Sequence, residues 1–383
     1  MKIIRLLPLL VLLLSFEAFS KKIVHIGLAS NFSELSTVSF NPFGGYFKDA
    51  IELAIKDNKS LLEKANIEFR LTELDYGTND LNIIKQIKEA AKTDMVAVIG
   101  YNYSSSALIA ASIHVQEKLP MFSPSASANR LRTFGKYVHL GSFDNAFMTK
   151  TLAKIATQVL KRKRVLILTA VNCAYCVDLS STFTKEIEKR GGVIVKNISI
   201  IQEDSDFTKI ALEAKKLSFD VVFVPNQEIT AARLISALVE VGINTPFLGA
   251  DSWGNEGTEF FRVLKGKKFN GYSVTHWHPK LKTKKSQKFV ADYIKNYQKL
   301  PNDTSVLAYD SMTMFIQTIS KIKDFNRENV EKALNAVNTF NGVTGTYYFT
   351  PNKAPRKDIL VLKTTDSGFA IHQIISPDKG GNL

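Results

Sequence analysis

The chain has 383 residues, of which 45% are hydrophobic and 22% are charged, a balance typical of a folded, soluble protein. Single hydrophobic cores stop growing below this length, so we expect two domains of ordinary size. The formal net charge is +14. The basic residues form interrupted clusters at residues 161–164 and 280–288, which favours a solvated basic surface and argues against nucleic-acid binding.

The first twenty residues are typical of a secretory signal peptide. Lys2 and Arg5 precede an apolar run at residues 6–16, and Ala18 and Ser20 are small residues at the positions that a signal peptidase inspects. The run is too short to span a bilayer, and no later segment reaches the roughly 20 apolar residues that a membrane helix needs. An amphipathic or buried first helix is the alternative. We expect cleavage after residue 20 and a soluble mature protein outside the cytoplasm.

Short apolar runs then alternate with amphipathic segments. The nearly continuous apolar character predicts buried strands at residues 23–29, 67–74, 95–101 and 120–123. Helical spacing of apolar residues predicts helices between them, at residues 46–56, 81–91 and 107–115. This β-α-β series predicts a parallel sheet with right-handed crossovers and helices on both faces.

The same alternation begins again at residue 164. Strands are predicted at residues 164–170, 193–201, 221–225 and 246–249, with helices at 180–189, 207–216 and 231–241. A last group contains helices at residues 285–298, 305–321 and 330–337 and strands at 346–349, 359–363 and 370–375. The fold class is therefore α/β, with two doubly wound parallel-sheet lobes and a crevice at the carboxyl ends of the strands of each sheet.

Five short motifs follow one another along the chain. They are Val-Ile-Gly at residues 98–100 with Ser-Ser-Ser at 104–106, Met-Phe-Ser-Pro-Ser-Ala-Ser at 121–127, Asp-Ser-Asp-Phe at 204–207, Phe-Leu-Gly-Ala-Asp at 247–251, and Phe-Asn-Gly-Val-Thr-Gly at 340–345. Their order and spacing resemble the type I periplasmic binding proteins, in particular the leucine/isoleucine/valine-binding branch that serves ABC importers. The resemblance extends from about residue 22 to residue 375, and its specificity lies in the co-linear order of the motifs.

The resemblance implies two lobes of discontinuous segments, joined by three crossings, with the ligand bound in the cleft between them. The crossings are expected near Asp144, Thr275 and Gly342. Lobe 1 then contains residues 21–144 and 275–341, and lobe 2 contains residues 145–274 and 342–383. Such lobes close around a ligand by a hinge motion.

Serines follow two neighbouring predicted strands. Ser104 and Ser105 lie at the start of a helix, where backbone N–H groups and the helix dipole attract an anion. Helix capping by Ser104 is the alternative. Ser125 and Ser127 follow the next strand and should reach the same sheet edge, although an ordinary polar loop is also possible there. The resemblance implies that Ser104 binds a ligand carboxylate and that Ser125 and Ser127 hold the α-carboxylate and amino group.

The second lobe supplies the other candidates. The resemblance implies that Asp251 pairs with the ligand ammonium, so that both poles of a zwitterion are satisfied; a turn or cap role is the alternative. It also places Tyr175 as an aromatic residue of the cleft. Asn226 follows the strand at residues 221–225, and Phe43 and Trp253 are candidates for the walls of the site.

Cys173 and Cys176 are the only cysteines. In an oxidising compartment they can close a small disulfide that stiffens the loop presenting Tyr175, although the same spacing occurs in thioredoxin-like redox proteins. The branched-chain amino acid-binding branch usually has its disulfide in the first lobe, near positions 75 and 103, which hold no cysteine here.

His276 and His278 would share one face of an extended strand, but no third metal ligand lies at a telling distance, so ordinary packing is favoured. The sequence has neither a nucleophile elbow nor a phosphate-binding loop. We therefore expect no catalytic residues, no metal and no cofactor.

These features predict a monomeric extracytoplasmic binding protein that closes on an amino-acid-like or amide ligand and delivers it to the permease of an ABC importer. Two alternatives remain open at this point. One is a periplasmic sensor or docking protein of the same fold, and the other is a thiol oxidoreductase that uses Cys173 and Cys176.

Overall fold

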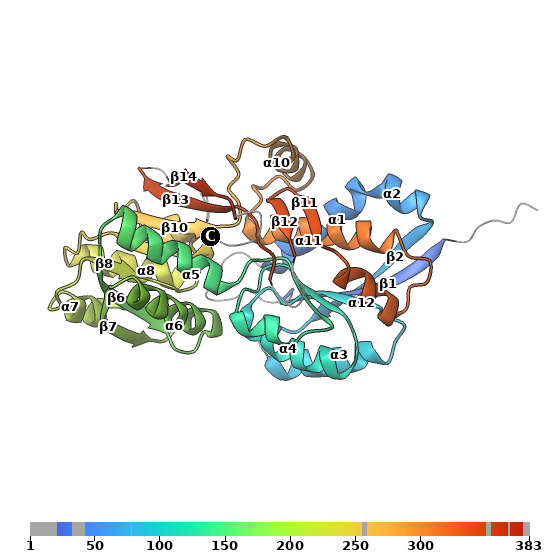
Figure 1. Cartoon of the computed structure of the whole chain (residues 1–383), viewed down its shortest axis with the longest axis horizontal. Helices are drawn as coiled ribbons and strands as arrows, with labels where there is room; N and C mark the ends of the chain where they lie inside the picture. The colour runs from blue at the N-terminus through green and yellow to red at the C-terminus, as the bar shows by residue number, and fades with distance from the viewer. Residues whose placement is uncertain are drawn as a thin grey trace, which may run out of the picture.

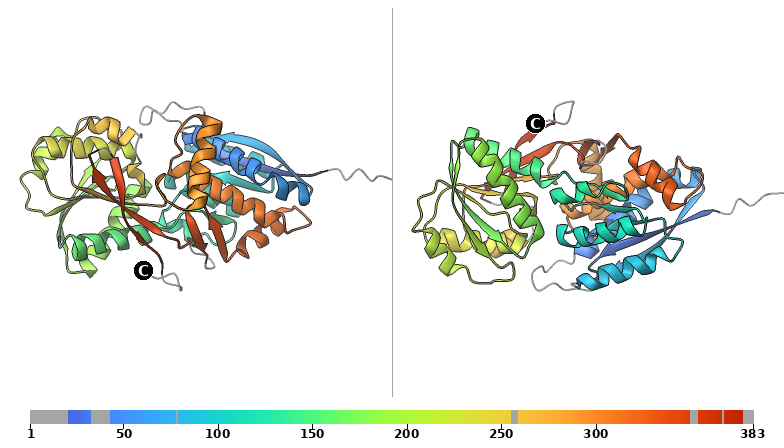
Figure 2. Two further views of the ribbon diagram at one scale, coloured as in Figure 1. Left: turned by 90° about the horizontal axis from the view of Figure 1, so that it is seen from above. Right: turned by 60° about the horizontal axis from the view of Figure 1, so that its bottom comes forward.

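The computed structural model describes residues 21–32, 43–77, 79–254, 259–349, 354–366 and 368–377. The predicted signal peptide lies outside the described residues. Two lobes lie next to each other, each built around its own sheet (Figures 1 and 2). None of the described helices is long and apolar enough to cross a membrane.

The sheet of the first lobe is parallel throughout, with the strand order β2-β1-β3-β4-β5. Its strands are β1 (Lys22–Ser30), β2 (Ile67–Asp75), β3 (Ala97–Gly100), β4 (Met121–Ser123) and β5 (Val138–Leu140). The order steps outward from β1 in both directions, so the connecting helices are placed on opposite faces. The predicted doubly wound arrangement is confirmed here.

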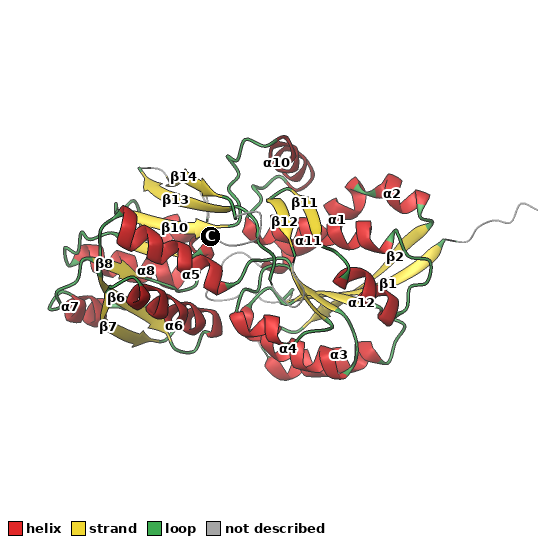
Figure 3. Cartoon of the chain, in the orientation of Figure 1, coloured by secondary structure: helices red, strands yellow, loops and turns green. Residues whose placement is uncertain are grey.

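Helices cover both faces of this sheet (Figure 3). One face carries α1 (Phe43–Asp57), α2 (Lys59–Lys64), α10 (Lys284–Tyr297) and α11 (Asp303–Ile319). The other carries α3 (Asp80–Ala91), α4 (Ser104–Gln116) and the 3-10 helix η1 (Asn129–Thr133), and α12 (Arg327–Asn335) packs near α11. Alternate residues of β1 serve the two faces: Val24, Ile26 and Leu28 belong to the core beneath α1, whereas Ala29 belongs to the core beneath α3 and α4.

The sheet of the second lobe has the order β14-β13-β10-β9-β8-β6-β7. Its strands are β6 (Arg164–Ala170), β7 (Val193–Ile200), β8 (Val221–Phe223), β9 (Phe247–Gly249), β10 (Gly271–Thr275), β13 (Ile359–Thr365) and β14 (Gly368–Ile375). The pairings from β7 to β10 are parallel, but β13 pairs antiparallel with both β10 and β14. The parallel sheet therefore carries an antiparallel edge, as mixed sheets often do.

Helices also cover this second sheet. They are α5 (Asn145–Lys154), continued by the π-helix η2 (Ile155–Val159), then α6 (Ala174–Lys189), α7 (Thr208–Ala214), α8 (Glu228–Glu240), the 3-10 helix η3 (Asp251–Trp253) and α9 (Glu259–Leu264). In Figure 1, α5 and α6 lie together on one side of the sheet and α8 lies on the other. The predicted helices and strands are confirmed with shifted ends. The elements that were not predicted are α2, β5, α5, α9, β10 and β11 (Thr339–Gly342), together with the 3-10 and π-helices.

The chain passes between the lobes at three places. It leaves the first sheet after β5, returns from β10 to α10, and leaves again after the hairpin of β11 and β12 (Gly345–Tyr348) to enter β13. We expected these passages near Asp144, Thr275 and Gly342. The exact division of the chain into two domains remains a prediction.

Candidate functional site

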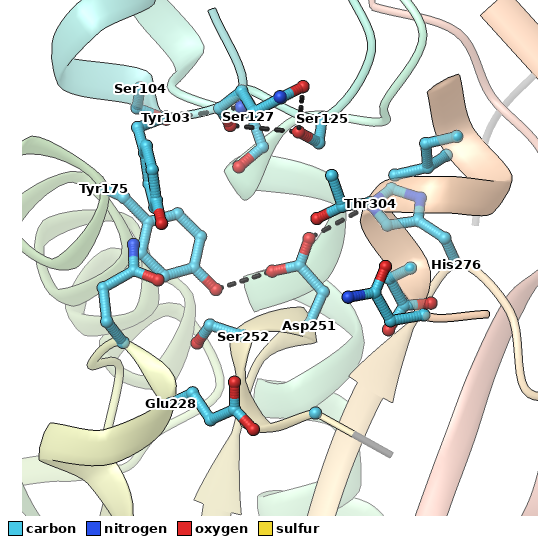
Figure 4. A pocket seen from close by; sticks show the side chains of 16 residues that line it. Tyr103, Ser104, Ser125, Ser127, Tyr175, Glu228, Asp251, Ser252, His276 and Thr304 are labelled. Atoms are coloured by element: carbon cyan, nitrogen blue, oxygen red, sulfur yellow. Dashed lines mark hydrogen bonds and ion pairs between the residues drawn. The ribbon is translucent and has the colours of Figure 1, made fainter. Parts of the chain in front are cut away.

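A pocket lies between the lobes, at the carboxyl ends of strands from both sheets (Figure 4). This is where open α/β sheets bind their ligands. The first lobe lines it with Asn102, Tyr103, Ser104, Ser125, Ser127, Asn302, Asp303, Thr304 and Leu307. The second lobe lines it with Tyr175, Gln227, Glu228, Asp251, Ser252 and Gly254, and His276 comes from the second passage between the lobes.

The serine edge of the pocket, formed by Ser104, Ser125 and Ser127, is built by the loops after β3 and β4. Because these strands are parallel neighbours, their following loops meet at one edge of the sheet. The Ser104 hydroxyl oxygen accepts hydrogen bonds from the backbone N–H of Ser127 at 3.3 Å and of Ala128 at 3.2 Å. The predicted convergence of the two serine segments is therefore present in the structure.

Ser104 is the first residue of α4, and the cap position belongs to Tyr103, whose side chain makes no capping hydrogen bond. The Ser104 hydroxyl therefore bridges to the next loop and does not cap its own helix. Since its oxygen accepts two backbone hydrogen bonds, its single proton can be donated to a ligand acceptor. The adjoining N-terminus of α4 adds unpaired backbone N–H groups and a partial positive charge.

Gly100 sets the course of the chain into this edge. It has a φ of +150°, and a Cβ at this position would lie 2.0 Å from the backbone oxygen of Ala29 on β1. Tyr101 follows with a φ of 56°, in the left-handed region that non-glycine residues rarely adopt. Both residues turn the chain sharply at the end of β3 and bring Asn102 to Ser104 into the pocket.

Asp251 is the acidic centre on the second-lobe side. It follows β9 and begins η3. The Tyr175 hydroxyl donates to its Oδ1 at 2.6 Å, and His276 Nε2 lies 3.1 Å from its Oδ2. Figure 4 shows these three side chains in contact, opposite Ser125 and Ser127. Each carboxylate oxygen is thus held by one protein donor, which fixes the orientation of the carboxylate toward the pocket.

The protonation states of the two partners fit this arrangement. Burial, reinforced by the neighbouring Asp251, raises the pKa of Tyr175 well above its ordinary value, so the phenol keeps its proton. Burial and the positive charge of Lys357 lower the pKa of His276 to about 4. The imidazole is therefore neutral at neutral pH, and its Nε2–H donates to Asp251.

Two further carboxyl groups line the pocket. Glu228 begins α8, and its Oε1 accepts a hydrogen bond from the Phe260 backbone N–H at 3.0 Å. Asp303 begins α11, and its Oδ2 accepts from the Thr275 hydroxyl at 3.1 Å. Burial, with repulsion from Asp251, raises the pKa of Asp303 to about 8.

A polar network lies beside the pocket where the third passage meets α11. The buried Lys357 ammonium donates to the Thr344 hydroxyl at 2.6 Å and to the Tyr347 hydroxyl at 3.2 Å. Asp310 of α11 accepts from the Thr344 backbone N–H and from both of these hydroxyls. Burial lowers the pKa of Lys357 to about 7. The network ties the segment before β13 to the first lobe.

The two cysteines form a disulfide, as predicted. It encloses the start of α6, with Cys173 at the cap position and Tyr175 between the two cysteines. Both sulfur-bearing residues are buried, which does not favour thiol exchange with another protein. The disulfide instead fixes the helix turn that presents Tyr175 to Asp251.

Three predicted site residues do not line the pocket. Ser105 is exposed on α4. Asn226 is fully buried, where its amide accepts from the Ala170 N–H and donates to the Leu168 carbonyl, so it joins the ends of β8 and β6. Its neighbour Gln227 faces the pocket instead.

Trp253 is the third correction. It is buried in the core of the second lobe, stacks on Phe260 and donates to the Val224 carbonyl at 3.0 Å. Gly249 makes room for it, because a Cβ there would lie 2.0 Å from the indole ring. The side chain of Phe43 lies outside the described residues, so its predicted role in the wall of the site is not tested.

Sequence reasoning missed Asn102, Glu228, His276 and Asp303 as residues of the site. His276 was assigned to ordinary packing, although its ring stacks on Phe143 at 3.7 Å while its Nε2 contacts Asp251. His278 accepts from the Lys280 backbone N–H. Within the described ranges, no group of three or more His, Cys, Asp or Glu residues is arranged to hold a metal.

Comparison with known proteins identifies related chains. A family model for periplasmic binding proteins matches residues 24–368. The chain is 24% identical over 254 residues to a leucine-, isoleucine-, valine-, threonine- and alanine-binding protein of Pseudomonas aeruginosa. That alignment covers 66% of this chain and 66% of the relative, just under two thirds of its length.

Solved structures share the fold along almost the whole chain. A leucine-binding protein of Thermotoga maritima has a TM-score of 0.83 at 23% identity, with 93% of this chain and 99% of that chain covered. A solute-binding protein of an ABC transporter from R. palustris, in complex with 4-hydroxybenzoate, has a TM-score of 0.80 at 18% identity, with 94% and 99% covered. At these identities the likeness shows the two-lobed fold.

Proposed function

Because the chain belongs to the periplasmic binding protein family, we propose that it is an extracytoplasmic solute-binding protein for a small amino-acid-like ligand. In this proposal residues 1–20 are a cleaved signal peptide, and the mature monomer in the periplasm delivers its ligand to the permease of an ABC importer. It binds and releases the ligand without chemical change. The relative that binds leucine, isoleucine, valine, threonine and alanine supports an amino-acid-like ligand.

One observation carries this proposal. Ser104, Ser125 and Ser127 from the first lobe face the same pocket as Asp251 and Tyr175 from the second. Hydroxyl donors at a helix N-terminus suit a carboxylate, whereas a carboxylate held by two protein donors suits an ammonium group. The two sides together therefore match the two poles of a zwitterion, which must both be satisfied when the ligand is buried.

The two lobes are expected to close around the ligand because each lobe contributes part of the site. A ligand that contacts both lobes has a higher affinity for the closed arrangement, and only such a difference in affinity can shift the population toward it. The lobes proposed for this motion contain residues 21–144 with 275–341 and residues 145–274 with 342–383. The closed form is the one that the importer would recognise.

A thermal-shift screen of the mature protein against amino acids, amides and small carboxylates tests the proposal. A ligand at 100 times its dissociation constant should add about 2.7 kcal/mol to the free energy of unfolding. The Ser104→Ala and Asp251→Asn variants should lose most of the shift while keeping the unfolding temperature of the ligand-free protein. Ser105→Ala is the matched control, since Ser105 is exposed on the same helical turn and should leave the shift unchanged.

If no compound of the panel shifts the unfolding temperature of the folded wild-type protein, the binding role is contradicted. An equal fall in unfolding temperature without ligand in Ser104→Ala and Asp251→Asn would assign both residues to folding. A shift that survives both substitutions would place the ligand elsewhere in the molecule.

A further inference from the structure

The acidic residues that line the pocket indicate more about the ligand than that it is a zwitterion. Among the described residues that line it there are three carboxyl groups, of Asp251, Glu228 and Asp303, and there is no lysine or arginine. His276, the one basic side chain among these described residues, is neutral at neutral pH because burial lowers its pKa to about 4. The protein as a whole is strongly basic, with a formal net charge of +14. The acidic lining is therefore a local feature, opposite in sign to the net charge of the protein.

The carboxyl groups interact with one another across this small space. Burial raises the pKa of Asp303 to about 8, and repulsion from Asp251 and Glu228 adds to the increase. Figure 4 shows Glu228, Ser252 and Asp251 next to one another, on the side of the pocket opposite the serine edge. The buried Lys357 beside the pocket offsets part of this negative charge, and a cationic ligand group inside the pocket would offset more of it.

A separate observation fixes the direction in which such a ligand would lie. Asn102 is 9% exposed and lines the pocket beside the serine edge. The Ser125 hydroxyl donates to the Asn102 backbone carbonyl at 3.0 Å and lies 3.3 Å from Asn102 Oδ1, while Asn102 Nδ2 has no hydrogen-bond partner among the described residues. A buried N–H donor without a partner costs free energy unless a ligand acceptor reaches it. This end of the pocket therefore suits a carboxylate, and the acidic end suits positive charge.

The number of acidic groups distinguishes ligand classes. A neutral aliphatic amino acid would bring one cation, its ammonium group, to Asp251, whereas a basic amino acid would bring a second cation toward Glu228 and Asp303. An aromatic acid without an amino group would bring a negative charge, and no cation, toward the carboxyl groups of the pocket.

We propose that the ligand is a basic amino acid, whose α-carboxylate lies at the serine edge and Asn102, whose α-ammonium pairs with Asp251, and whose side-chain cation lies between Glu228 and Asp303. This inference rests on the proposed binding function and specifies its substrate class. Each charged group of the ligand then has a partner of opposite polarity, from a different element of the chain.

Isothermal titration of the mature protein with matched pairs of amino acids tests the inference. L-lysine is compared with L-norleucine, which lacks the side-chain ammonium, and L-arginine with the neutral L-citrulline; L-leucine and benzoate complete the panel. We expect at least one basic ligand to bind about 100-fold more tightly than its neutral counterpart, which corresponds to the loss of a charge-assisted contact in a desolvated site.

Isosteric variants test which residues cause the preference for a basic ligand over a neutral one. Glu228→Gln and Asp303→Asn should each reduce the ratio of affinities for the basic and neutral ligands by about tenfold, with little change in the affinity for the neutral one. Glu213→Gln is the matched control, since Glu213 pairs with Lys196 on the surface of α7, at the far end of the second lobe. It should leave the ratio unchanged.

The outcomes separate this inference from the function on which it rests. Tight binding of L-leucine, L-norleucine or L-citrulline with weaker binding of their basic counterparts would overturn the basic-ligand inference and leave the binding function standing. Binding of benzoate in preference to every amino acid would also overturn it. If no compound of the panel binds to folded protein, the proposed binding function fails, and the inference fails with it.

Discussion

The Tyr175 hydroxyl donates a hydrogen bond of 2.6 Å to Asp251 Oδ1. The two residues come from different elements of the second lobe, α6 and η3, and they meet at the floor of the interlobe pocket. On the other oxygen of the same carboxylate, neutral His276 is the second donor. Asp251 is thus oriented before any ligand arrives, which reduces the cost of ordering it on binding.

Removal of the tyrosine hydroxyl should weaken ligand binding. In Tyr175→Phe the ring remains, but Asp251 loses one fixed donor and can rotate, so we expect about a tenfold increase in the dissociation constant, or about 1.4 kcal/mol. Isothermal titration measures it. Tyr309→Phe is a close control, because it also removes a tyrosine-to-aspartate hydrogen bond, at 2.8 Å to Asp57, outside the pocket. Equal affinities in the two variants would contradict the role of Tyr175.

The disulfide should stabilise both the fold and the site. For the double variant Cys173→Ser, Cys176→Ser, we expect a decrease of about 2 kcal/mol in the free energy of unfolding, because a short loop is no longer closed in the unfolded chain. We also expect severalfold weaker ligand binding, since Tyr175 lies between the two cysteines. Urea denaturation and titration measure the two effects. Insulin-reduction activity in the wild type that is lost in Cys176→Ser would contradict a purely structural disulfide.

The sequence was sufficient for the parts of the site that follow from strand order. Consecutive apolar runs predict parallel neighbours, and parallel neighbours bring the segments after them to one edge, which is why Ser104, Ser125 and Ser127 could be grouped before the structure was known. Asp251 was assigned to the site by the family resemblance, because a position after a strand also fits a turn or cap residue. The three serine positions depend on local periodicity and on the direction of the chain.

The rest of the site depends on tertiary packing that a single sequence does not encode in a local pattern. His276 and Asp303 reach the pocket because a passage between the lobes and the start of α11 converge there. Buried Asn226 and pocket-facing Gln227 are consecutive residues, and periodicity cannot predict which of the two faces the pocket at the irregular end of a strand. Trp253 fills space left by Gly249, and complementarity of this kind is visible only in three dimensions.

The buried Lys357 should make the stability of the ligand-free protein depend on pH. Its pKa is lowered from an ordinary value of about 10.4 to about 7 in the folded protein. Between these values the unfolded chain binds more protons than the native one, so the free energy of unfolding rises with pH. From pH 8 to 9.5 the wild type should gain stability relative to Lys357→Met, by up to about 1.4 kcal/mol per pH unit.

Urea denaturation followed by circular dichroism at the two pH values measures this difference. Lys189→Met, an exposed substitution on α6, serves as the control and should follow the wild type across the same window. Parallel pH profiles for the wild type and Lys357→Met would show that Lys357 is charged in the native protein at pH 8.

Binding of a basic ligand should release a proton from Asp303. The carboxyl group is largely protonated at pH 7, because its pKa is raised to about 8. A ligand cation beside it favours the ionised form, lowers the pKa and expels the proton. Titration in phosphate and in Tris buffers, which differ in ionisation enthalpy, should report a release that approaches one proton at pH 7 and falls toward zero at pH 9. An equal release in Asp303→Asn would assign the proton to another group.

The most direct test of the two-poled site combines ligand analogues with variants. Affinities of the best-binding amino acid, its carboxamide and its deaminated acid are measured for the wild type, Ser104→Ala and Asp251→Asn. We predict that loss of the ligand carboxylate costs much less in Ser104→Ala than in the wild type, and that loss of the ammonium costs much less in Asp251→Asn. Equal losses in all three proteins would contradict the assignment of the serine edge to the carboxylate and of Asp251 to the ammonium group.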